Sequence, residues 1–177
     1  MWLDILILGH LAQGPAHGYE IKRRVGRSTG HLQALNNNVL YPALHRLDEM
    51  GAVESELVPQ QASPPRRVYR LTEQGGEALR GMLEDFPEES ALNDGEFNVR
   101  LAYFELIDPE ARVEILRTRA TRVQKLLQHL RGSLVEMAGG SAHGYAPRLV
   151  EFLIRQRESE IRFLEDLADE EERRTNP

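Results

Sequence analysis

Apolar positions in the first half of the chain recur at helical spacing in four places and at strand spacing in two. Intervals of three and four residues predict helices at residues 3–12, 17–27, 38–50 and 73–85. Between the third and fourth helices, the run AVESELV places Val53, Ser55 and Leu57 on one face, and the run RRVYRLT does so for Tyr69 and Leu71. The polar segment PQQASPP separates these runs, so a hairpin with a seven-residue tip at residues 59–65 is expected.

Local signals support these boundaries. Gly51 stands where a helix-ending residue with positive φ is expected, and Thr72 is a candidate N-cap for the fourth helix. The stretch STGHLQALNN, residues 28–37, is predicted to connect the second and third helices. The stretch FPEESALNDG, residues 86–95, has the composition of a domain boundary.

The second half of the chain has only helical spacing. Residues 97–107 form one predicted helix, and DPE at residues 108–110 starts a long one with an N-cap, a proline and an acidic first turn. A strict heptad seam runs through Val113, Leu116, Ala120, Val123, Leu127, Leu130, Leu134 and Met137. Gly139 and Gly140 end this helix. A last helix is expected at residues 147–170, with a seam through Val150, Ile154, Ile161, Leu164 and Ala168 that Arg157 interrupts, followed by a frayed EEERRTNP end.

This order of elements predicts a mainly α-helical fold with a small β-hairpin wing. Three helices, a hairpin and a fourth helix describe a winged helix-turn-helix DNA-binding domain, which we place at residues 1–86. Residues 94–172 are predicted to form a helical domain for dimerisation and possible effector binding. Its seam is longer than one helix can bury alone, so a second subunit is expected to close it at Val113, Leu116, Val123, Leu127, Leu130 and Leu134.

The helix predicted at residues 38–50 has two contrasting faces. Val39, Leu40, Ala43, Leu44 and Leu47 share the apolar face. The candidate DNA-binding residues on and just before the other face are Asn37, Asn38, Tyr41, Pro42, His45 and Arg46. Asparagine can read adenine edges, arginine can read guanine or bind phosphate, and tyrosine and histidine reach phosphate oxygens. A solvated helix face of unusual composition is the alternative.

The predicted hairpin adds a second basic feature. Arg66 and Arg67 follow directly after Pro64 and Pro65, near the expected tip, where they suit phosphate or minor-groove contact. A solvated hairpin is again the alternative. Finding the polar helix and the basic hairpin in this order favours DNA binding over either alternative.

The distribution of charge along the chain is compatible with DNA binding by the first half. The 177 residues carry a net charge of −6, but residues 1–85 hold 9 Lys/Arg against 10 Asp/Glu, leaving 13 against 18 for the rest. The basic residues of the first half cluster in KRRVGR and RRVYR, so that half can present one basic face. One or two of Lys22, Arg23 and Arg24 are expected near the DNA, without a choice among them.

Several classes of function have no support in the sequence. There is no cysteine, and none of the six histidines has the spacing of a helix-face metal pair. No apolar run reaches the ~18 residues of a membrane span, and the apolar start lacks the basic residues of a signal peptide. No nucleophile motif or phosphate loop is present. We therefore expect a soluble, cytoplasmic protein that is not an enzyme and needs no cofactor or metal.

Three motifs together resemble the PadR family of bacterial transcriptional regulators. They are HGYEI at residues 17–21, LYPALHRLDEMGAVE at residues 40–54 and RRVYRLTEQG at residues 66–75. The resemblance implies a dimeric repressor whose recognition helix and wing contact double-stranded operator DNA, with a C-terminal helical region that pairs the subunits. It also implies a possible small-molecule effector, since some members respond to phenolic acids. Asn36 to Val39 depart from the Ser, Thr or Gly usual before Leu-Tyr-Pro, which leaves the operator sequence open.

The remaining candidate residues are considered both as parts of the core and as binding residues. His17 and Tyr19 are expected to hold the first turn and the core rather than touch DNA. Phe97, Tyr103 and Phe104 could line an effector pocket or form plain core. The alternative for the whole chain is a winged-helix protein-interaction module without specific DNA binding. A two-fold dimer predicts an inverted-repeat operator with half-sites roughly 10 base pairs apart.

Overall fold

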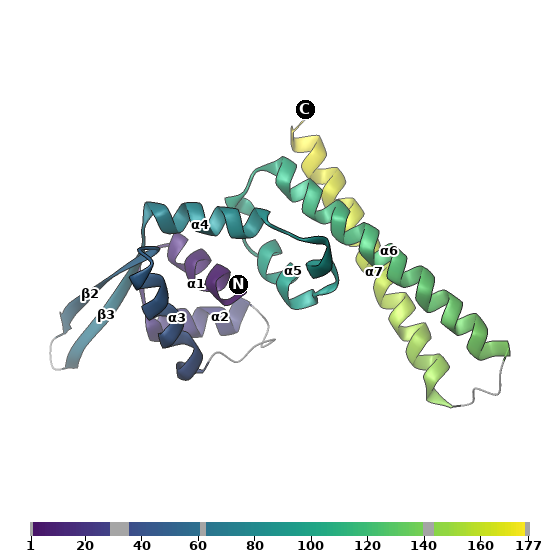
Figure 1. The fold of residues 1–177 in the computed structure, drawn as a ribbon, viewed down its shortest axis with the longest axis horizontal. Coiled ribbons are helices and arrows are strands. Elements are labelled where there is room, and N and C mark those ends of the chain that lie inside the picture. The colour runs from purple at the N-terminus through teal and green to yellow at the C-terminus, as the bar shows by residue number, and fades with distance from the viewer. Residues whose placement is uncertain (1, 29–35, 61–62, 140–143, 176–177) are drawn as a thin grey trace. The chain divides into compact units, whose positions relative to one another are not determined.

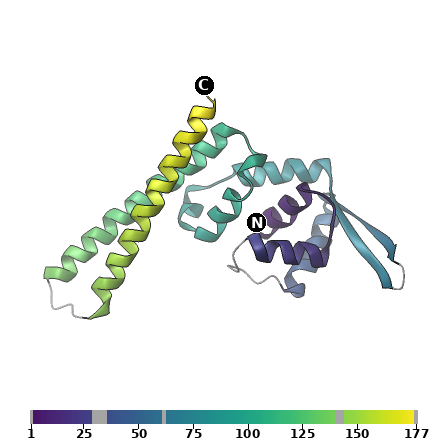
Figure 2. The ribbon, with the colours of Figure 1, turned by 180° about the vertical axis from the view of Figure 1, so that it is seen from behind.

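The computed structural model describes residues 2–28, 36–60, 63–139 and 144–175, in two compact units (Figures 1 and 2). Unit 1 comprises Met1–Asp85 and Asn93–Ile107, and unit 2 comprises Phe86–Leu92 and Asp108–Pro177. Residues 93–107 therefore pack with the N-terminal unit, although the sequence pattern had grouped most of them with the C-terminal helices.

The three helices, hairpin and fourth helix predicted for the first half occur in unit 1 in that order, together with a short first strand that was not predicted. Unit 1 contains α1 (Trp2–Ala12), β1 (Ala16–His17), α2 (Gly18–Ser28), α3 (Asn37–Glu49), β2 (Val53–Gln60), β3 (Ser63–Leu71), α4 (Glu73–Glu84), α5 (Asp94–Leu101) and the 3-10 turn η2 (Phe104–Leu106). The mainly helical fold with a β-hairpin wing is confirmed. The single helix predicted at residues 97–107 is wrong, because α5 ends at Leu101 and η2 follows. Most of the connection predicted at residues 28–37 lies outside the described residues.

Helix α1 forms the centre of the core of unit 1. Its residues from Ile5 to Leu8 are fully buried, so it has no solvent face of its own. Gly9 allows the ring of Tyr103 to approach, since a Cβ at Gly9 would lie 2.6 Å from that ring. The Tyr103 hydroxyl donates to the carbonyl of Leu6 at 3.4 Å, which ties the end of unit 1 to its first helix.

The wing is longer than its sequence suggested and has a third strand at its base. The antiparallel sheet has the order β1-β3-β2, and the pairing of Ala16 with Tyr69 was not predicted. The expected seven-residue tip is wrong, because pairing continues to Gln60 and Ser63 past an irregularity between Val58 and Gln60. Proline can be tolerated at such an irregularity, which explains why Pro59 does not end the strand.

Two predicted boundaries of unit 1 are confirmed. Gly51 ends α3 with φ 71°, and Thr72 caps α4 by accepting a hydrogen bond from the amide of Gly75 at 3.0 Å. Gly75 also lies against the backbone just before β2, where a Cβ would be 1.9 Å from the carbonyl oxygen of Ala52. Any side chain at Gly75 would therefore separate the wing from α4.

Unit 2 is a helical hairpin with one short 3-10 helix against it. η1 (Glu88–Leu92) precedes α6 (Pro109–Gly139), and α7 (Tyr145–Thr175) returns antiparallel beside α6 (Figures 1 and 2). The predicted start of α6 and its end at Gly139 are confirmed. The frayed end predicted after residue 170 is wrong, because α7 continues to Thr175 and buries Glu171, which Arg112 contacts at 2.8 Å.

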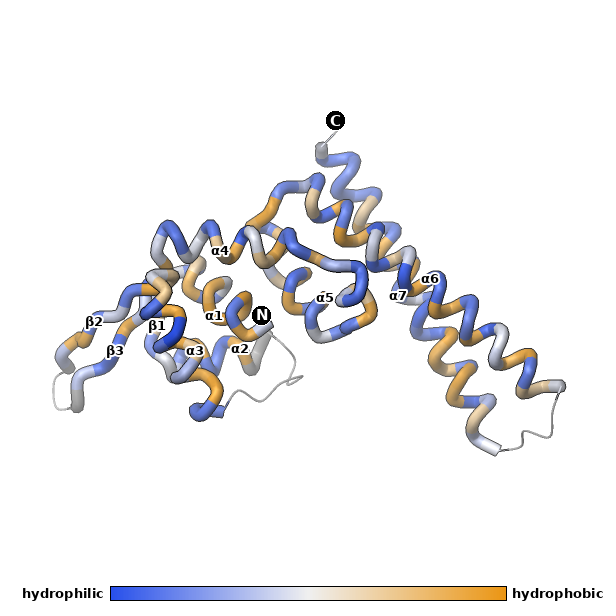
Figure 3. Tube along the Cα trace, viewed as in Figure 1, coloured by the Kyte–Doolittle hydropathy of each residue, from blue (hydrophilic) through white to orange (hydrophobic). Residues whose placement is uncertain are grey.

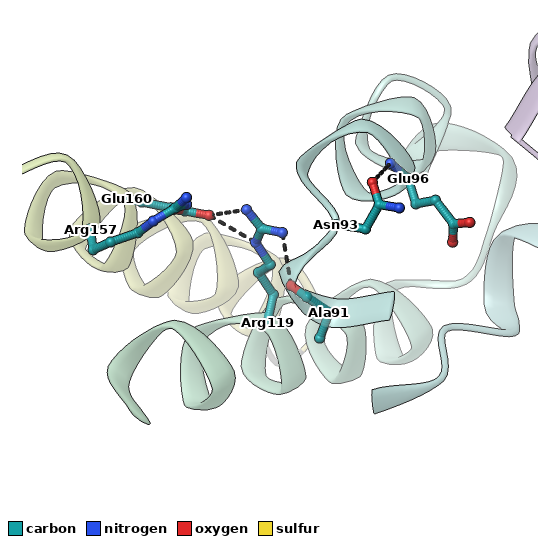
Figure 4. A network of polar contacts seen from close by, with 6 residues as sticks. All are labelled: Ala91, Asn93, Glu96, Arg119, Arg157 and Glu160. Atoms are coloured by element: carbon teal, nitrogen blue, oxygen red, sulfur yellow. Dashed lines mark hydrogen bonds and ion pairs between the residues drawn. The ribbon is translucent and has the colours of Figure 1, made fainter. Parts of the chain in front are cut away.

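A buried ion pair joins all three elements of unit 2 (Figure 4). The guanidinium of Arg119 on α6 is 2% exposed and donates through Nε to Glu160 of α7 at 2.8 Å. Its Nη1 donates to the carbonyl of Ala91 in η1 at 2.8 Å. Arg157 also contacts Glu160, so the position that interrupts the apolar seam of α7 carries the ion pair's second cation.

Candidate nucleic-acid interface

Helix α3 separates its buried and exposed residues as the wheel predicted, with one exception. Leu40, Ala43, Leu44 and Leu47 are buried. The six candidate DNA-binding residues in this segment are all exposed: Asn37, Asn38, Tyr41, Pro42, His45 and Arg46. Val39 was expected on the apolar face but is 43% exposed beside them. The helix has no acidic residue before Asp48, so this face is suited to an anionic partner.

Neighbouring elements hold several of these side chains. Arg46 forms an ion pair with Asp4 of α1, which anchors α3 to the core. Asn37 Oδ1 accepts a hydrogen bond from Lys22 Nζ of α2 at 3.0 Å. Asn36, two residues before the predicted start of the helix, is its N-cap and accepts a hydrogen bond from the amide of Val39 at 3.0 Å. Asn38 therefore starts the exposed face on a capped helix end.

The two wing arginines lie in the middle of β3 and not near the tip. Arg66 pairs with Val58 and Arg67 with Leu57, because the strands extend beyond the predicted ends. Arg67 Nη1 donates to Ser55 Oγ at 2.9 Å. Both arginines remain exposed, so their charges are still available to a ligand along the wing.

A groove of about 830 Å³ lies between the start of α2, helix α3 and strand β3. Arg23, Tyr41, Arg66 and Arg67 line it, which makes it mainly cationic and aromatic. The Tyr41 ring packs on Gly18, where a Cβ would come within 2.8 Å of the ring. The glycine of the HGYEI motif therefore holds the tyrosine of the LYP motif at the groove.

The three consecutive cations Lys22, Arg23 and Arg24 of α2 differ in their surroundings. Lys22 donates to Asn37, and Arg24 pairs with Glu20 on its own helix. Arg23 is exposed and lines the groove. The structure therefore singles out Arg23, which sequence spacing alone did not distinguish from its neighbours.

His17 and Tyr19 do not behave alike. Tyr19 was predicted to support the core, but it is 69% exposed and lines the groove. His17 does hold the first turn of α2, since its Nδ1 faces the amide of Glu20 at 3.3 Å. It also lines the groove, which the sequence pattern gave no reason to expect.

The predicted dimer seam is partly filled by the chain itself. Leu116, Val123 and Leu127 are buried, and Val123 and Leu127 form a core cluster with Ile161 of α7. Val113, Leu130 and Leu134 are only partly covered. The face of α7 away from this cluster carries four exposed apolar side chains: Tyr145, Leu149, Phe152 and Phe163. Hydrophobic positions recur along both α6 and α7 (Figure 3).

The described residues give no support for an effector pocket, a metal site or a membrane-spanning helix. Phe97, Tyr103 and Phe104 are buried side chains of unit 1, as their core interpretation predicted. Within the described ranges, no three His, Asp or Glu side chains gather as a metal site would require. None of the helices described combines the length and apolar character needed to cross a membrane.

Comparison with known proteins identifies the family. The model of the transcriptional regulator PadR-like family matches residues 7–81, which contain α3 and the wing. The chain is also 38% identical over 88 residues to the transcriptional regulator Rv3488 of Mycobacterium tuberculosis, covering 47% of this chain and 77% of the relative. The chain belongs to the PadR-like family. This member is therefore a transcriptional regulator, as the three motifs predicted, because the family is one of regulators and not of enzymes.

Two further relatives extend the comparison of this PadR-like chain. The negative transcriptional regulator PadR of Bacillus subtilis is 23% identical over 132 residues, covering 74% of this chain and 72% of the relative. Its crystal structure in complex with operator DNA gives a TM-score of 0.45 at 20% identity, covering 94% of this chain and 96% of that one. A transcriptional regulator from Clostridium thermocellum gives a TM-score of 0.45 at 28% identity, covering 48% and 79%.

Proposed function

We propose that this PadR-like regulator represses transcription by binding an inverted-repeat operator as a homodimer. The observation that carries the proposal is the exposed face of α3, where Asn37, Asn38 and Tyr41 lie in a stretch of the helix that has no acidic residue. His45 follows on this face, with the carboxylate of Glu49 3.5 Å from its Nδ1. The Bacillus subtilis relative is a negative transcriptional regulator, which supports repression.

Helix α3 is the recognition helix of this proposal. Asn38 lies at its N-terminal end, which is the part of such a helix that meets base edges in the major groove. Its amide can donate to and accept from adenine. Tyr41, Pro42 and His45 follow on the same exposed face, where they contact the backbone beside the bases. Arg46 mainly secures the helix through Asp4.

The wing contributes charge rather than sequence reading. Arg66 and Arg67 lie along β3 next to the groove and not at the hairpin end. They are placed to follow the phosphate backbone beside the recognition helix. Such contacts raise the affinity for every duplex and make binding strongly dependent on salt.

In this proposal, residues 1–86 carry DNA binding and the helices α6 and α7 within residues 94–172 carry the pairing of subunits, since residues 93–107 pack with unit 1. A second copy would cover the exposed apolar face of α7, whose members Tyr145, Leu149 and Phe152 are spaced by four and three residues. That spacing is the one used between paired helices. Since Leu127 is already covered by α7 of its own chain, the partner would add to the seam at Leu130 and Leu134.

Selection from a pool of random duplexes tests the proposal. We expect the full chain to enrich an inverted repeat with half-sites about 10 base pairs apart, because a two-fold dimer presents two recognition helices one helical turn apart. Enrichment of a single half-site without a dyad would contradict the dimeric mode. Absence of duplex binding at low salt would favour a winged helix that contacts protein.

A further inference from the structure

The imidazole of His17 faces a hydrogen-bond donor at each of its two nitrogens. Its Nδ1 lies 3.3 Å from the backbone amide of Glu20, at the first turn of α2. Its Nε2 lies 3.3 Å from Nη1 of Arg66 on β3. β1 brings the two side chains together, because His17 pairs with Val68 and Arg66 is two residues away on the same face.

A neutral imidazole cannot satisfy both contacts. It has one acceptor nitrogen, and the other carries a proton. With the proton on Nε2, the Glu20 amide is satisfied but Nε2–H points at the Arg66 guanidinium. With the proton on Nδ1, Arg66 finds an acceptor but Nδ1–H points at the Glu20 amide, and the Glu20 carboxylate is 3.7 Å away. The chain alone therefore leaves one contact mismatched in either tautomer.

An anionic oxygen between Nε2 and Arg66 removes the mismatch. It accepts from both Nε2–H and the guanidinium, while Nδ1 continues to accept from the amide of Glu20. Arg23 and Tyr41 line the same groove, and each has a polar group that can donate to an anion there. The carboxylate of Glu20 also lines the groove, but Arg24 pairs with it and offsets its charge.

We infer that His17 and Arg66 together hold one phosphodiester of the DNA backbone in this groove. The inference rests on the proposed function, because it takes DNA to be the partner of α3 and the wing. A backbone phosphodiester fits better than a free anion, since the groove opens between the two elements assigned to DNA. His17 thereby becomes a contact residue and not only the support of a turn.

Two substitutions at residue 17 separate the phosphate contact from the support of the turn. His17→Asn keeps an acceptor for the Glu20 amide, since asparagine is a good N-cap, but it cannot reach Arg66. His17→Gln places an amide donor close to the position of Nε2 and weakens the cap instead. His129→Asn, at an exposed position of α6, is the matched control.

Binding to a labelled random-sequence duplex of about 25 base pairs is the measurement, because phosphate contacts carry no base information. We expect His17→Asn to weaken binding about tenfold per half-site, the size of one lost charge-assisted hydrogen bond. His17→Gln and His129→Asn should bind nearly as the unaltered chain does. Thermal unfolding should show that His17→Asn lowers the melting temperature less than His17→Gln does, because asparagine keeps the cap of α2.

A double-mutant cycle tests whether the two residues share one phosphate. Arg66→Ala should reduce the slope of log affinity against log salt by about 0.9, the value of one phosphate charge. Adding His17→Asn to Arg66→Ala should then cause little further loss. Fully additive losses, or His17→Asn binding as tightly as the unaltered chain, would overturn the inference.

Failure of this inference can be told apart from failure of the proposed function. If the unaltered chain binds duplexes but residue 17 has no effect, only the phosphate site is wrong. If the unaltered chain binds no duplex, the proposed function fails as well. Long-range 1H–15N spectra should show His17 Nε2 responding to duplex, and a response to inorganic phosphate alone would overturn the assignment to DNA.

Discussion

At the residue scale, the buried imidazole of His10 makes the stability of unit 1 depend on pH. His10 is 5% exposed, and its ring meets the Tyr103 ring edge to face with centroids 5.9 Å apart. Burial lowers the pKa of His10 from its ordinary 6.5, and the charge of Arg24 lowers it further. The unfolded chain therefore takes up this proton more readily than the folded chain. The stability that depends on neutral His10 is fully present above pH 6.5 and is lost as the pH falls below it.

Replacing His10 by phenylalanine should remove this pH dependence. Phenylalanine keeps an aromatic ring against Tyr103 but has no proton to gain. One proton changes the free energy of unfolding by at most about 1.4 kcal/mol per pH unit. Urea unfolding at pH 7.5 and pH 5.5 should show a larger acid loss for the unaltered chain than for His10→Phe. Equal losses would mean that His10 is not the group responsible.

Asn38 and the wing arginines should differ in what they change. Asn38→Ala should relax the preference at particular base positions, since it removes a contact to base edges. Arg66→Ala with Arg67→Ala should weaken all duplexes similarly and flatten the salt dependence. Arg80→Ala, which removes one exposed charge from α4, is the control for the loss of a single surface arginine. Binding to a panel of operator variants measures both effects, and the opposite pattern would exchange the two assignments.

At the element scale, the ion pair of Arg119 and Glu160 holds η1, α6 and α7 of unit 2 together. Removing the cation and removing the carboxylate should lower the stability of unit 2 by different amounts. Arg119→Met leaves Glu160 with its contact to Arg157, and methionine fills the space of the arginine stem. Glu160→Leu removes the carboxylate that both Nε and Nη2 of Arg119 contact, while the cation stays buried. Breaking a buried pair from one side costs about 3–5 kcal/mol when a charge stays behind.

We therefore expect Glu160→Leu to destabilise unit 2 by about 3 kcal/mol and Arg119→Met by clearly less. Urea unfolding followed by far-ultraviolet circular dichroism measures both. The double variant Arg119→Met with Glu160→Leu should recover much of the loss, because apolar side chains of similar volume can replace a buried pair. A double variant as unstable as Glu160→Leu alone would show that packing, and not charge, sets the cost.

Sequence spacing predicted elements well wherever one face of an element is buried. The wheel placed Leu40, Ala43 and Leu44 inward, and the structure buries all three. The same reasoning misplaced Val39, because a residue in the first turn lies beyond the reach of the core. The same reasoning predicted strands that were too short for the wing. Pro59 and Pro65 are turn signals locally, but the pairing of β2 with β3 continues past them.

The candidate site was only partly visible in the sequence for a physical reason. Residues on one helix, such as Asn38 and Tyr41, can be grouped by periodicity. His17 and Arg66 are 49 positions apart and meet only because β1 pairs with β3. A two-residue strand such as Ala16–His17 has no periodicity to detect. Sequence periodicity could not predict the burial of Arg119 either, because its carboxylate partner lies on another helix.

At the scale of the whole molecule, unit 2 offers two apolar surfaces on which the proposed dimer could be built. The heptad seam of α6 was predicted to meet a second subunit, yet Leu127 is 6% exposed and packs with Val123 and Ile161 of its own chain. The face of α7 with Phe152 and Phe163 is about half exposed at both positions. Substitutions on the two surfaces should therefore have different consequences.

Phe152→Ser with Phe163→Ser should give a folded monomer, because both side chains are about half exposed and a partner would cover them. Sedimentation should then show the mass of one 20.2 kDa chain and not of two. Operator affinity should fall steeply, since each half-site alone binds weakly. Val135→Ser, at a 73% exposed position of α6, is the control and should remain dimeric.

Leu127→Asp should instead unfold unit 2, because it places a carboxylate inside the cluster that joins α6 and α7. The circular dichroism spectrum of Leu127→Asp should show a loss of helix, whether or not the variant associates. A folded, monomeric Leu127→Asp would show that the seam opens to the partner subunit after all. If the two serine substitutions left the dimer and its DNA binding unchanged, pairing would have to lie outside the α7 face, with Leu130 and Leu134 as the next positions to replace, since α7 covers them only in part.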